Sequence, residues 1–179
     1  VPNLYDQWKE NPTSSLSIIR TYPWHVEDKS ILIGDAAHAT VPFYGQGMNA
    51  GFEDCRILDE LLEKYDSNIK DCFSEYSKQR KPNGDSLQDL SMQNFIVMRD
   101  KTANQRFLLQ KKIEQKFAQK YPDKWTPLYS MVSFSNISYA EAWDIGMKQE
   151  KLMEKIMSIP DIEKIWESKL IMSKMSSFL

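Results

Sequence analysis

Apolar residues recur every three or four positions between residues 48 and 65, which is the spacing of an amphipathic α-helix. The predicted apolar face comprises Phe52, Cys55, Leu58, Leu61, Leu62 and Tyr65. Charged side chains, Asp54 among them, fall mostly on the opposite face. The pattern therefore predicts a helix of about five turns that begins near Met48.

Two β-rich runs precede this helix and are typical of strands. One covers residues 17–22 and ends before Pro23, and the other covers residues 30–34 and is almost continuously apolar. Two strands do not form a stable sheet by themselves, so we expect both to belong to a larger sheet. The preceding residues, 1–15, predict a loop or a short helix.

Helical spacing returns after residue 68 and predicts a mostly α-helical second half. The first expected helix begins at residue 69 and ends in the region of Pro82-Asn83-Gly84. Residues 83–121 are expected to form either one long helix or two helices with a bend. Two further helices are expected over residues 140–158 and 161–178. Residues 131–137 fit either a strand or an extended connector. We divide the chain into residues 1–80, which carry the strands, and a helical domain of residues 81–179.

The composition excludes several classes of function. The 179 residues are 41% apolar and 27% charged with a formal charge of -2, which is typical of a globular protein and provides no basic surface for nucleic acid. Cys55 and Cys72 fall on predicted helices, so we expect buried free thiols rather than a disulfide. Residues 1–4 resemble neither a signal peptide nor a transit peptide, and we expect a longer parent chain.

The strongest chemical signal follows the second predicted strand. It comprises Gly34-Asp35-Ala36-Ala37-His38-Ala39 and then Pro42-Phe43-Tyr44-Gly45-Gln46-Gly47-Met48-Asn49. A strand that ends in Gly-Asp puts a carboxylate at the sheet edge where open α/β folds bind ligands. Glycines let the backbone approach a planar ring, and free amides at a helix start favour an anionic ligand. On spacing alone, a simple turn with a glycine cap is an equal alternative.

The full run resembles the second flavin-binding motif of class A FAD-dependent aromatic hydroxylases. Residues 41–55 are similar to the kynurenine 3-monooxygenase group of that family, and residues 89–99 and 126–135 match it in the same order. The resemblance implies an α/β, Rossmann-like FAD-binding hydroxylase fold, to which this mostly α-helical chain contributes a few strands of the shared sheet. It also implies that FAD, NADPH and O2 serve to hydroxylate L-kynurenine to 3-hydroxykynurenine through a flavin hydroperoxide.

The same resemblance assigns residues to the cofactor and to the substrate. The cofactor-binding residues are Gly34, Asp35, Pro42, Gly45, Gly47, Met48 and Asn49, and the substrate-binding residues are Phe43, Gln46, Asn94, Met98 and Tyr129. Asn94 and Tyr129 are expected to bond the amino-acid carboxylate of the substrate, whereas core packing is the alternative for Phe43. No catalytic side chain and no metal ligand are expected, because the cofactor supplies the chemistry.

Other positions are interpreted with the same comparison in view. Related enzymes usually carry Glu where Val97 stands, so we expect a pocket without that carboxylate. His38 lies where the chemistry needs no base, and we expect a structural hydrogen bond there. Arg99 points about 100 degrees away from Met98 on an ideal helix. We therefore expect the arginine that pairs with the substrate carboxylate to come from the N-terminal part of the enzyme.

The chain also lacks part of the family pattern. The Gly-x-Gly-x-x-Gly turn that forms the family's first FAD element has no counterpart here, so we expect a C-terminal portion that works with the N-terminal part of the same enzyme. The resemblance implies the cytosolic face of the mitochondrial outer membrane. Residues 150–179 lack an obvious spanning anchor and fit either a lid over the pocket or a helix on a membrane surface.

Two alternative functions stay open on the sequence. One is a related flavin hydroxylase that acts on another aromatic acid. The other is a noncatalytic helical module for protein interaction or membrane targeting that retains the glycine motif.

Overall fold

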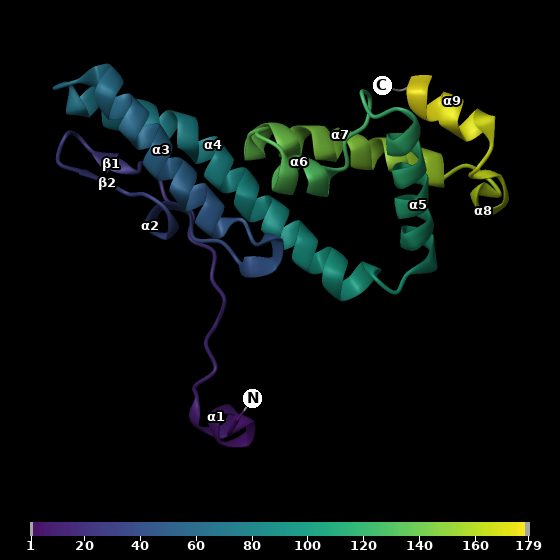
Figure 1. Cartoon of the computed structure of the whole chain (residues 1–179), viewed down its shortest axis with the longest axis horizontal. Coiled ribbons are helices and arrows are strands. Elements are labelled where there is room, and N and C mark those ends of the chain that lie inside the picture. The colour runs from purple at the N-terminus through teal and green to yellow at the C-terminus, as the bar shows by residue number, and fades with distance from the viewer. Residues whose placement is uncertain (1, 178–179) are drawn as a thin grey trace.

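The computed structural model describes residues 2–177 and shows a molecule built almost entirely from helices (Figure 1). The helices are α1 (Leu4–Glu10), α2 (Asp35–His38), α3 (Gly47–Tyr65), α4 (Ile69–Ile96), α5 (Gln105–Lys120), α6 (Leu128–Phe134), α7 (Tyr139–Met157), α8 (Ile162–Ile165) and α9 (Lys169–Ser177). A 3₁₀ turn, Pro42–Tyr44, precedes α3, and a π-helical turn, Val97–Lys101, follows α4. Helix α1 buries no residue and lies apart from the rest at the end of an extended segment (Figure 1). The predicted mostly α-helical character is confirmed.

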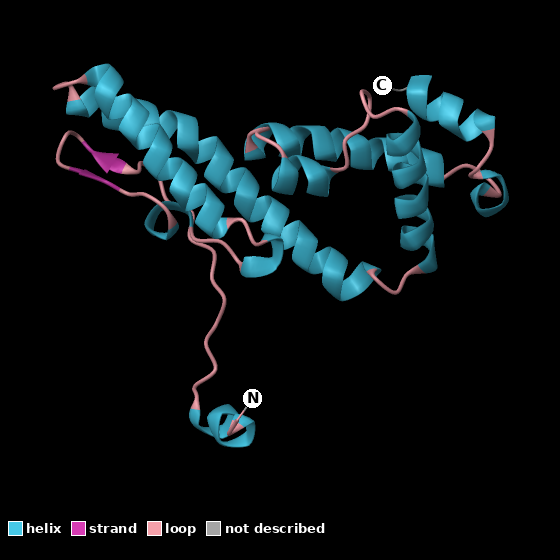
Figure 2. Ribbon diagram, viewed as in Figure 1, coloured by secondary structure: helices cyan, strands magenta, loops and turns pink. Residues whose placement is uncertain are grey.

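The β-structure within residues 2–177 is one short antiparallel pair, β1 (His25–Val26) and β2 (Ser30–Ile31). Figure 2 shows this pair beside α2 and the helical hairpin of α3 and α4. The predicted strand over residues 17–22 is wrong, and the one predicted over residues 30–34 is shorter than expected. The described residues therefore show only a two-stranded sheet, and its place in a larger shared sheet stays a prediction.

Residues 17–22 are extended but find other hydrogen-bond partners than a strand. The Ile19 N–H donates to the Ala39 carbonyl at 3.2 Å. Gln88 Nε2 of α4 donates to the carbonyls of both Ile19 and Ala39, at 2.7 and 2.9 Å. The Gln88 side chain thus provides hydrogen bonds to backbone carbonyls. In a sheet, a neighbouring strand would provide these bonds.

Helix α3 confirms the predicted helix, but its buried face is not the predicted one. Ala50, Asp54 and Leu61 are buried. Phe52 is 67% exposed, and Cys55 is exposed as well. The expectation of a buried thiol is therefore wrong for Cys55 and confirmed for Cys72, and both cysteines are free as predicted.

Helix α4 continues through Pro82, where the sequence predicts an end, so that prediction is wrong. A proline inside a helix removes a backbone hydrogen bond and costs about 3 kcal/mol. The helix is fixed on both sides of the proline, since Arg80 is buried in an ion pair and both Leu87 and Leu90 are fully buried. These tertiary contacts outweigh the local preference.

The remaining helical predictions differ in outcome. The bent pair α4 and α5 agrees with the expectation for residues 83–121, and α7 agrees with that for residues 140–158. The strand alternative for residues 131–137 is wrong, because α6 extends to Phe134 and buries Met131 and Val132, whereas residues 135–137 do form a connector.

The tail is also more broken than the sequence predicts. The helix expected over residues 161–178 is divided into α8 and α9, and residue 178 lies outside the described residues. The proposed boundary between residues 80 and 81 lies inside α4, and the division into two domains stays a prediction.

Buried apolar residues gather in three clusters. One joins β2, α3 and the start of α4 around Trp24, and a second joins α4, α6 and α7 around Leu87 and Leu90. The third joins α5, α7, α8 and α9 and includes Phe117, Trp125, Leu152, Met153, Ile156, Ile162, Ile171 and Met175. The apolar faces of the tail thus pack in one cluster with α5 and α7.

A fully buried carboxylate, Asp54, joins the first cluster to the glycine motif. Its Oδ2 accepts from the Gly34 N–H at 2.9 Å and from His38 Nε2 at 2.6 Å. Its Oδ1 accepts from Arg80 Nε at 2.6 Å, and Arg80 also pairs with Glu53 at 2.8 Å. The structural hydrogen bond expected of His38 is confirmed, whereas the placement of Asp54 on the solvent face of its helix is wrong.

Burial alone acts to raise the pKa of Asp54. The hydrogen bond from His38, the charge of Arg80 and the Gly34 amide outweigh burial and hold the pKa of this carboxyl below its ordinary value. Asp54 is therefore an ionised acceptor, which is what its three donors require.

We expect Asp54→Ala to destabilise the protein by about 3–5 kcal/mol, because the Arg80 guanidinium and the Gly34 amide lose their buried acceptor. Thermal unfolding measures the effect. Asp59→Ala on the exposed side of the same helix is the matched control and is expected to change stability by about 0.5 kcal/mol or less. Equal shifts for the two variants would contradict a central role for Asp54.

The same carboxylate predicts an acid-sensitive contribution to stability. Because the folded-state pKa is lowered, the contribution is complete above the unfolded-state pKa of about 4 and is lost as pH falls through the folded-state value. We expect Asp54→Asn to be less stable than the wild type at pH 7 and to lose less further stability on acidification. Parallel acid-unfolding curves for the two proteins would exclude this linkage.

Candidate functional site

The glycine loop between β2 and α3 depends on backbone conformations that favour glycine. Gly34 has φ +57° at the start of α2, and Gly45 has φ +69° after the 3₁₀ turn. A Cβ at either position meets no heavy atom within 4 Å, so both glycines border open space. Strain, rather than crowding, is what a side chain introduces here.

An open hollow of about 640 Å³ lies against this loop. Gly34, Asp35, Pro42, Gly45, Gly47 and Met48 line it, together with Thr40 and Gly51. The structure therefore brings together all of the predicted cofactor residues except Asn49. Asn49 donates from Nδ2 to Gln46 Oε1 at 2.8 Å, and both line a neighbouring cavity of about 680 Å³ between α3 and the α6–α7 connection.

The chemical groups around the hollow fit the polar and anionic parts of a flavin nucleotide. The Thr40 hydroxyl is buried and has no hydrogen-bond partner among the described residues. The amides of Gly47, Met48 and Asn49 open α3 and precede its first intrahelical bond, which Ala50 donates to Gln46. Asp35 adds an exposed carboxylate acceptor. Donors and an acceptor thus meet at one surface that glycines keep open.

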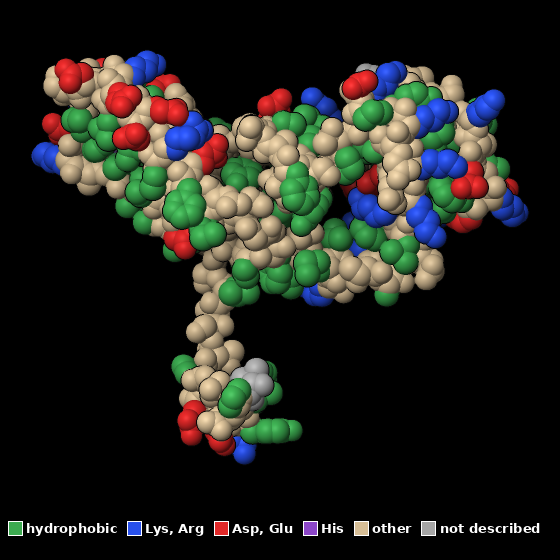
Figure 3. Space-filling view, viewed as in Figure 1, with side chains coloured by type: hydrophobic (Ala, Val, Ile, Leu, Met, Phe, Trp, Pro, Cys, Tyr) green, Lys and Arg blue, Asp and Glu red, His purple; other side chains and the backbone are tan. Residues whose placement is uncertain are grey.

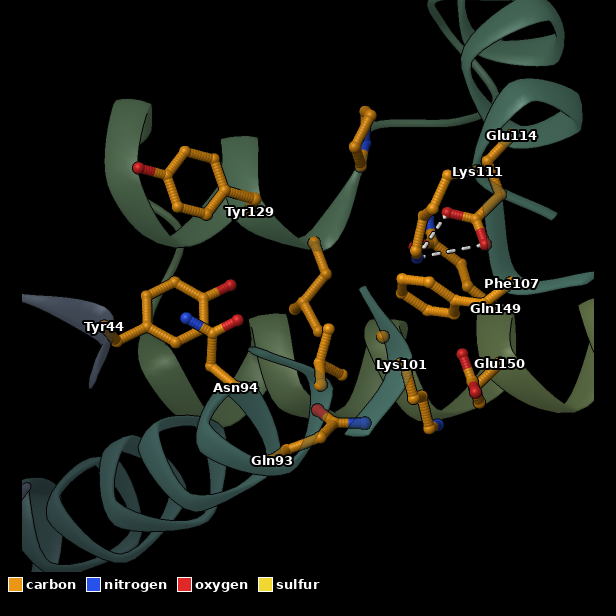
Figure 4. Close-up of a pocket in the computed structure, with 14 residues that line it drawn as sticks. Tyr44, Gln93, Asn94, Lys101, Phe107, Lys111, Glu114, Tyr129, Gln149 and Glu150 are labelled. Carbon is orange, nitrogen blue, oxygen red and sulfur yellow. Dashed lines mark hydrogen bonds and ion pairs between the residues drawn. The ribbon is translucent and has the colours of Figure 1, made fainter. Parts of the chain in front are cut away.

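A second cavity, of about 230 Å³, lies between the end of α4, α5, the start of α6 and α7 (Figure 4). Asn94 and Tyr129 both line it, although they are 35 positions apart in the sequence. The Tyr44 ring stacks on the Tyr129 ring with centroids 5.8 Å apart. Burial, with the nearby Tyr129 hydroxyl, raises the pKa of Tyr44 to about 12, so its hydroxyl stays protonated.

Asn94 connects this cavity to the glycine loop. Its Nδ2 donates to the Phe43 carbonyl at 2.7 Å, which fixes the 3₁₀ turn against α4. The Phe43 ring packs on Phe95 at 4.5 Å, so the side chain contributes to packing between these two elements. The predicted substrate residues Asn94 and Tyr129 therefore share one cavity wall with the loop close by.

Two other predicted substrate residues lie elsewhere. Met98 is 53% exposed and is not among the residues that line the cavity, although its sulfur lies 3.7 Å from Asn94 Nδ2. Gln46 faces the neighbouring cavity, where its Oε1 accepts from the Tyr139 hydroxyl at 3.4 Å. Val97 does line the cavity of Asn94 and Tyr129.

Sequence reasoning missed several polar residues of these sites. Thr40 carried no motif signal, and Tyr44, Lys101, Lys111 and Glu150 line the second cavity from four different elements. Their convergence follows from tertiary packing and has no local signature. Asp54 did have a signal, because it occupies the helical stripe of Ala50, Ile57 and Leu61.

Comparison with known proteins identifies relatives along the entire chain. A family profile described as an FAD binding domain matches residues 17–91. Kynurenine 3-monooxygenase of Flavobacterium psychrophilum is 52% identical over 179 residues, all of this chain and 40% of the relative. That of Flavobacterium johnsoniae is 50% identical over the same span, and that of Legionella pneumophila strain Corby is 42% identical over 169 residues.

These relatives correct the predicted location. They are bacterial proteins, and bacteria have no mitochondria, so the assignment to the mitochondrial outer membrane is wrong. Within residues 2–177, none of the helices has the length and apolar character needed to cross a membrane.

The matches cover this chain almost completely but only part of each relative. The chain spans about 40% of the length of the curated relatives it matches. The FAD-binding profile covers the segment that contains the glycine loop, the hollow and the buried Asp54. By sequence, the chain therefore belongs to the kynurenine 3-monooxygenase family and includes part of its FAD-binding domain.

Proposed function

We propose that the full-length protein is an FAD- and NADPH-dependent monooxygenase that converts L-kynurenine to 3-hydroxykynurenine. The observation that carries this proposal is the 52% identity, along all 179 residues, to a kynurenine 3-monooxygenase. The reaction consumes NADPH, a proton and O2, and it yields NADP+ and water beside the hydroxylated product. Identities of 42–52% to several proteins of this name support kynurenine over another aromatic acid.

In this proposal the glycine hollow holds FAD. The amides at the start of α3 and the Thr40 hydroxyl donate to its polar edge, and Asp35 accepts from its hydroxyl groups. A bound FAD would supply the redox chemistry, namely the uptake of electrons from NADPH and the insertion of one oxygen atom of O2 into the aromatic ring. The protein itself has to orient the two ligands and to exclude water.

The second cavity holds the amino-acid end of the substrate. Asn94 and Tyr129 provide hydrogen-bonding groups on its wall, and the Tyr44 hydroxyl, kept protonated by its raised pKa, is a further donor. The Asn94 bond to the Phe43 carbonyl sets the distance between this wall and the glycine loop. A substrate that reaches from the cavity wall to the glycine loop is thereby held in one orientation.

The rest of the site is proposed to come from the part of the full-length protein that this chain does not contain. Leu32, Ile33, Met48 and Phe52 are between 37% and 71% exposed. Figure 3 shows apolar side chains gathered over α3 and the loop before it. Exposed apolar surface of this kind favours coverage by another element, which in the proposal also supplies the adenine contacts and an arginine for the substrate carboxylate.

Anaerobic stopped-flow absorbance of the full-length protein tests the proposed reaction. We expect NADPH to reduce the bound flavin faster in the presence of L-kynurenine than in its absence, because the substrate completes the site. On admission of O2, 3-hydroxykynurenine is the expected product by chromatography. Flavin reduction that ignores kynurenine, or failure to form this product, would exclude the proposed activity.

Thr40→Val tests the cofactor hollow without turnover. Valine has nearly the same shape but no hydroxyl, so we expect weaker FAD binding by about three- to tenfold, the value of one lost hydrogen bond of about 1 kcal/mol. Fluorescence titration of the FAD-free full-length protein measures the dissociation constant. Thr21→Val is the control, since the Thr21 hydroxyl bonds to the Ala37 carbonyl outside the hollow. Unchanged FAD affinity in Thr40→Val would remove this contact from the proposal.

A further inference from the structure

The cavity that contains Asn94 and Tyr129 has a second, charged end. Figure 4 shows Tyr44, Asn94 and Tyr129 at one end, and Lys101, Lys111, Glu114 and Glu150 at the other. Asn94 and Lys101 are seven residues apart, which places the two ends roughly 10 Å apart along the helix axis. The charged end is therefore about two helical turns from Asn94 along the backbone.

Two of these four charges neutralise each other. Lys111 Nζ lies 2.8 and 3.1 Å from the two carboxylate oxygens of Glu114, and Gln110 donates to the same carboxylate at 2.9 Å. Glu114 is 9% exposed, so this pair belongs to the packed wall of the cavity. Its charges are satisfied without a ligand.

The other two charges are not paired in this way. Within residues 2–177, no carboxylate forms an ion pair with Lys101 within 4.0 Å, and Lys101 Nζ lies over the Phe107 ring, 5.8 Å from its centroid. Glu150 accepts a long bond, 3.4 Å, from Gln110 Nε2. Both side chains are half-buried and line the cavity from different elements, the π-helical turn and α7.

We propose that Lys101 and Glu150 form a subsite for the zwitterionic head of an α-amino acid. The Lys101 ammonium pairs with the carboxylate of the ligand, and the Glu150 carboxylate accepts from its ammonium group. Desolvation in a cavity strengthens such pairs relative to water. Phe107 provides an apolar wall beside them, since its ring also lies 5.3 Å from Lys111 Nζ.

The backbone at this subsite is unusual. Val97 and Lys101 lie on a π-helical turn, and π-helical turns occur frequently at functional sites. Both residues line the cavity, so the turn forms its wall between the Asn94 end and the charged end. The subsite is therefore separate from the Asn94 end of the same cavity.

This inference rests on the proposed function, because the substrate proposed there is an α-amino acid. The test uses the full-length protein with bound FAD and compares Lys101→Met with Lys112→Met, a control at an exposed position of α5. Calorimetric binding of L-kynurenine without NADPH gives a readout that is independent of turnover. The decarboxylated analogue kynuramine, which keeps the ammonium group, isolates the role of the carboxylate.

We expect Lys101→Met to weaken L-kynurenine binding at the subsite by about three- to tenfold, as for a partly exposed charge pair. We expect kcat/KM to be unchanged, because Asn94 and Tyr129 hold the substrate that reacts. Kynuramine is expected to respond to Glu150→Gln but not to Lys101→Met. The exchanged variant, Lys101→Glu with Glu150→Lys, is expected to regain most of the affinity because the zwitterion can bind in the reverse sense.

Each outcome separates the two proposals. Equal effects of Lys101→Met and Lys112→Met, or an equal loss for kynurenine and kynuramine, would overturn the subsite. A wild-type protein that binds kynurenine through Lys101 but does not hydroxylate it would leave the subsite standing and overturn the proposed function.

Discussion

The buried charge of Asp54 is the constraint on which the cofactor side of the molecule depends. A carboxylate in the interior is stable only if donors surround it, and the donors here come from the glycine loop, from α2 and from α4. The carboxylate can satisfy all of them only when these elements hold one relative position. Hydrophobic packing around Trp24 and Leu61 supplies stability but is less directional. The position of Gly34, and with it the edge of the hollow, is therefore set by electrostatics more than by packing.

Helix α4 connects the Asp54 network to the cavity that Asn94 and Tyr129 line. It runs from Ile69 to Ile96 without a break at Pro82, with Arg80 in the Asp54 network and Asn94 at the cavity. Asn94 in turn bonds the Phe43 carbonyl, which lies between the predicted cofactor and substrate residues. The glycine loop is thus connected to α4 at two points, at Gly34 through Asp54 and at Phe43 directly. Any ligand that spans the hollow and the cavity meets two walls whose separation a single element determines.

The sequence predicted those features that local rules control. The start of α3 follows from helical spacing and agrees with the structure, whereas the bend after α4 was one of two alternatives for residues 83–121. The predicted rotation of α3 about its axis is wrong, because apolar spacing places Phe52 and Cys55 on the buried face and the structure leaves both exposed. The choice of face is made by the partner helix, and Arg80 and Tyr76 select the side that contains Asp54. Strand prediction failed for a similar reason, since residues 17–22 obtain their hydrogen bonds from Gln88 instead of a strand.

Tertiary packing limits prediction of the candidate site from the sequence even more than prediction of the helix faces. Gly34, Asp35 and Gly47 were predictable because a short motif forms the hollow from consecutive residues. The second cavity has no such motif, since its walls come from helices whose order along the chain says nothing about which side chains converge. The charged residues of this cavity can be recognised once the structure is known, because a buried or half-buried charge without a partner lowers the stability of the protein. In this cavity an ammonium has no carboxylate partner within 4.0 Å and a carboxylate accepts only one long hydrogen bond, so the missing partner is most simply a ligand that carries both opposite charges.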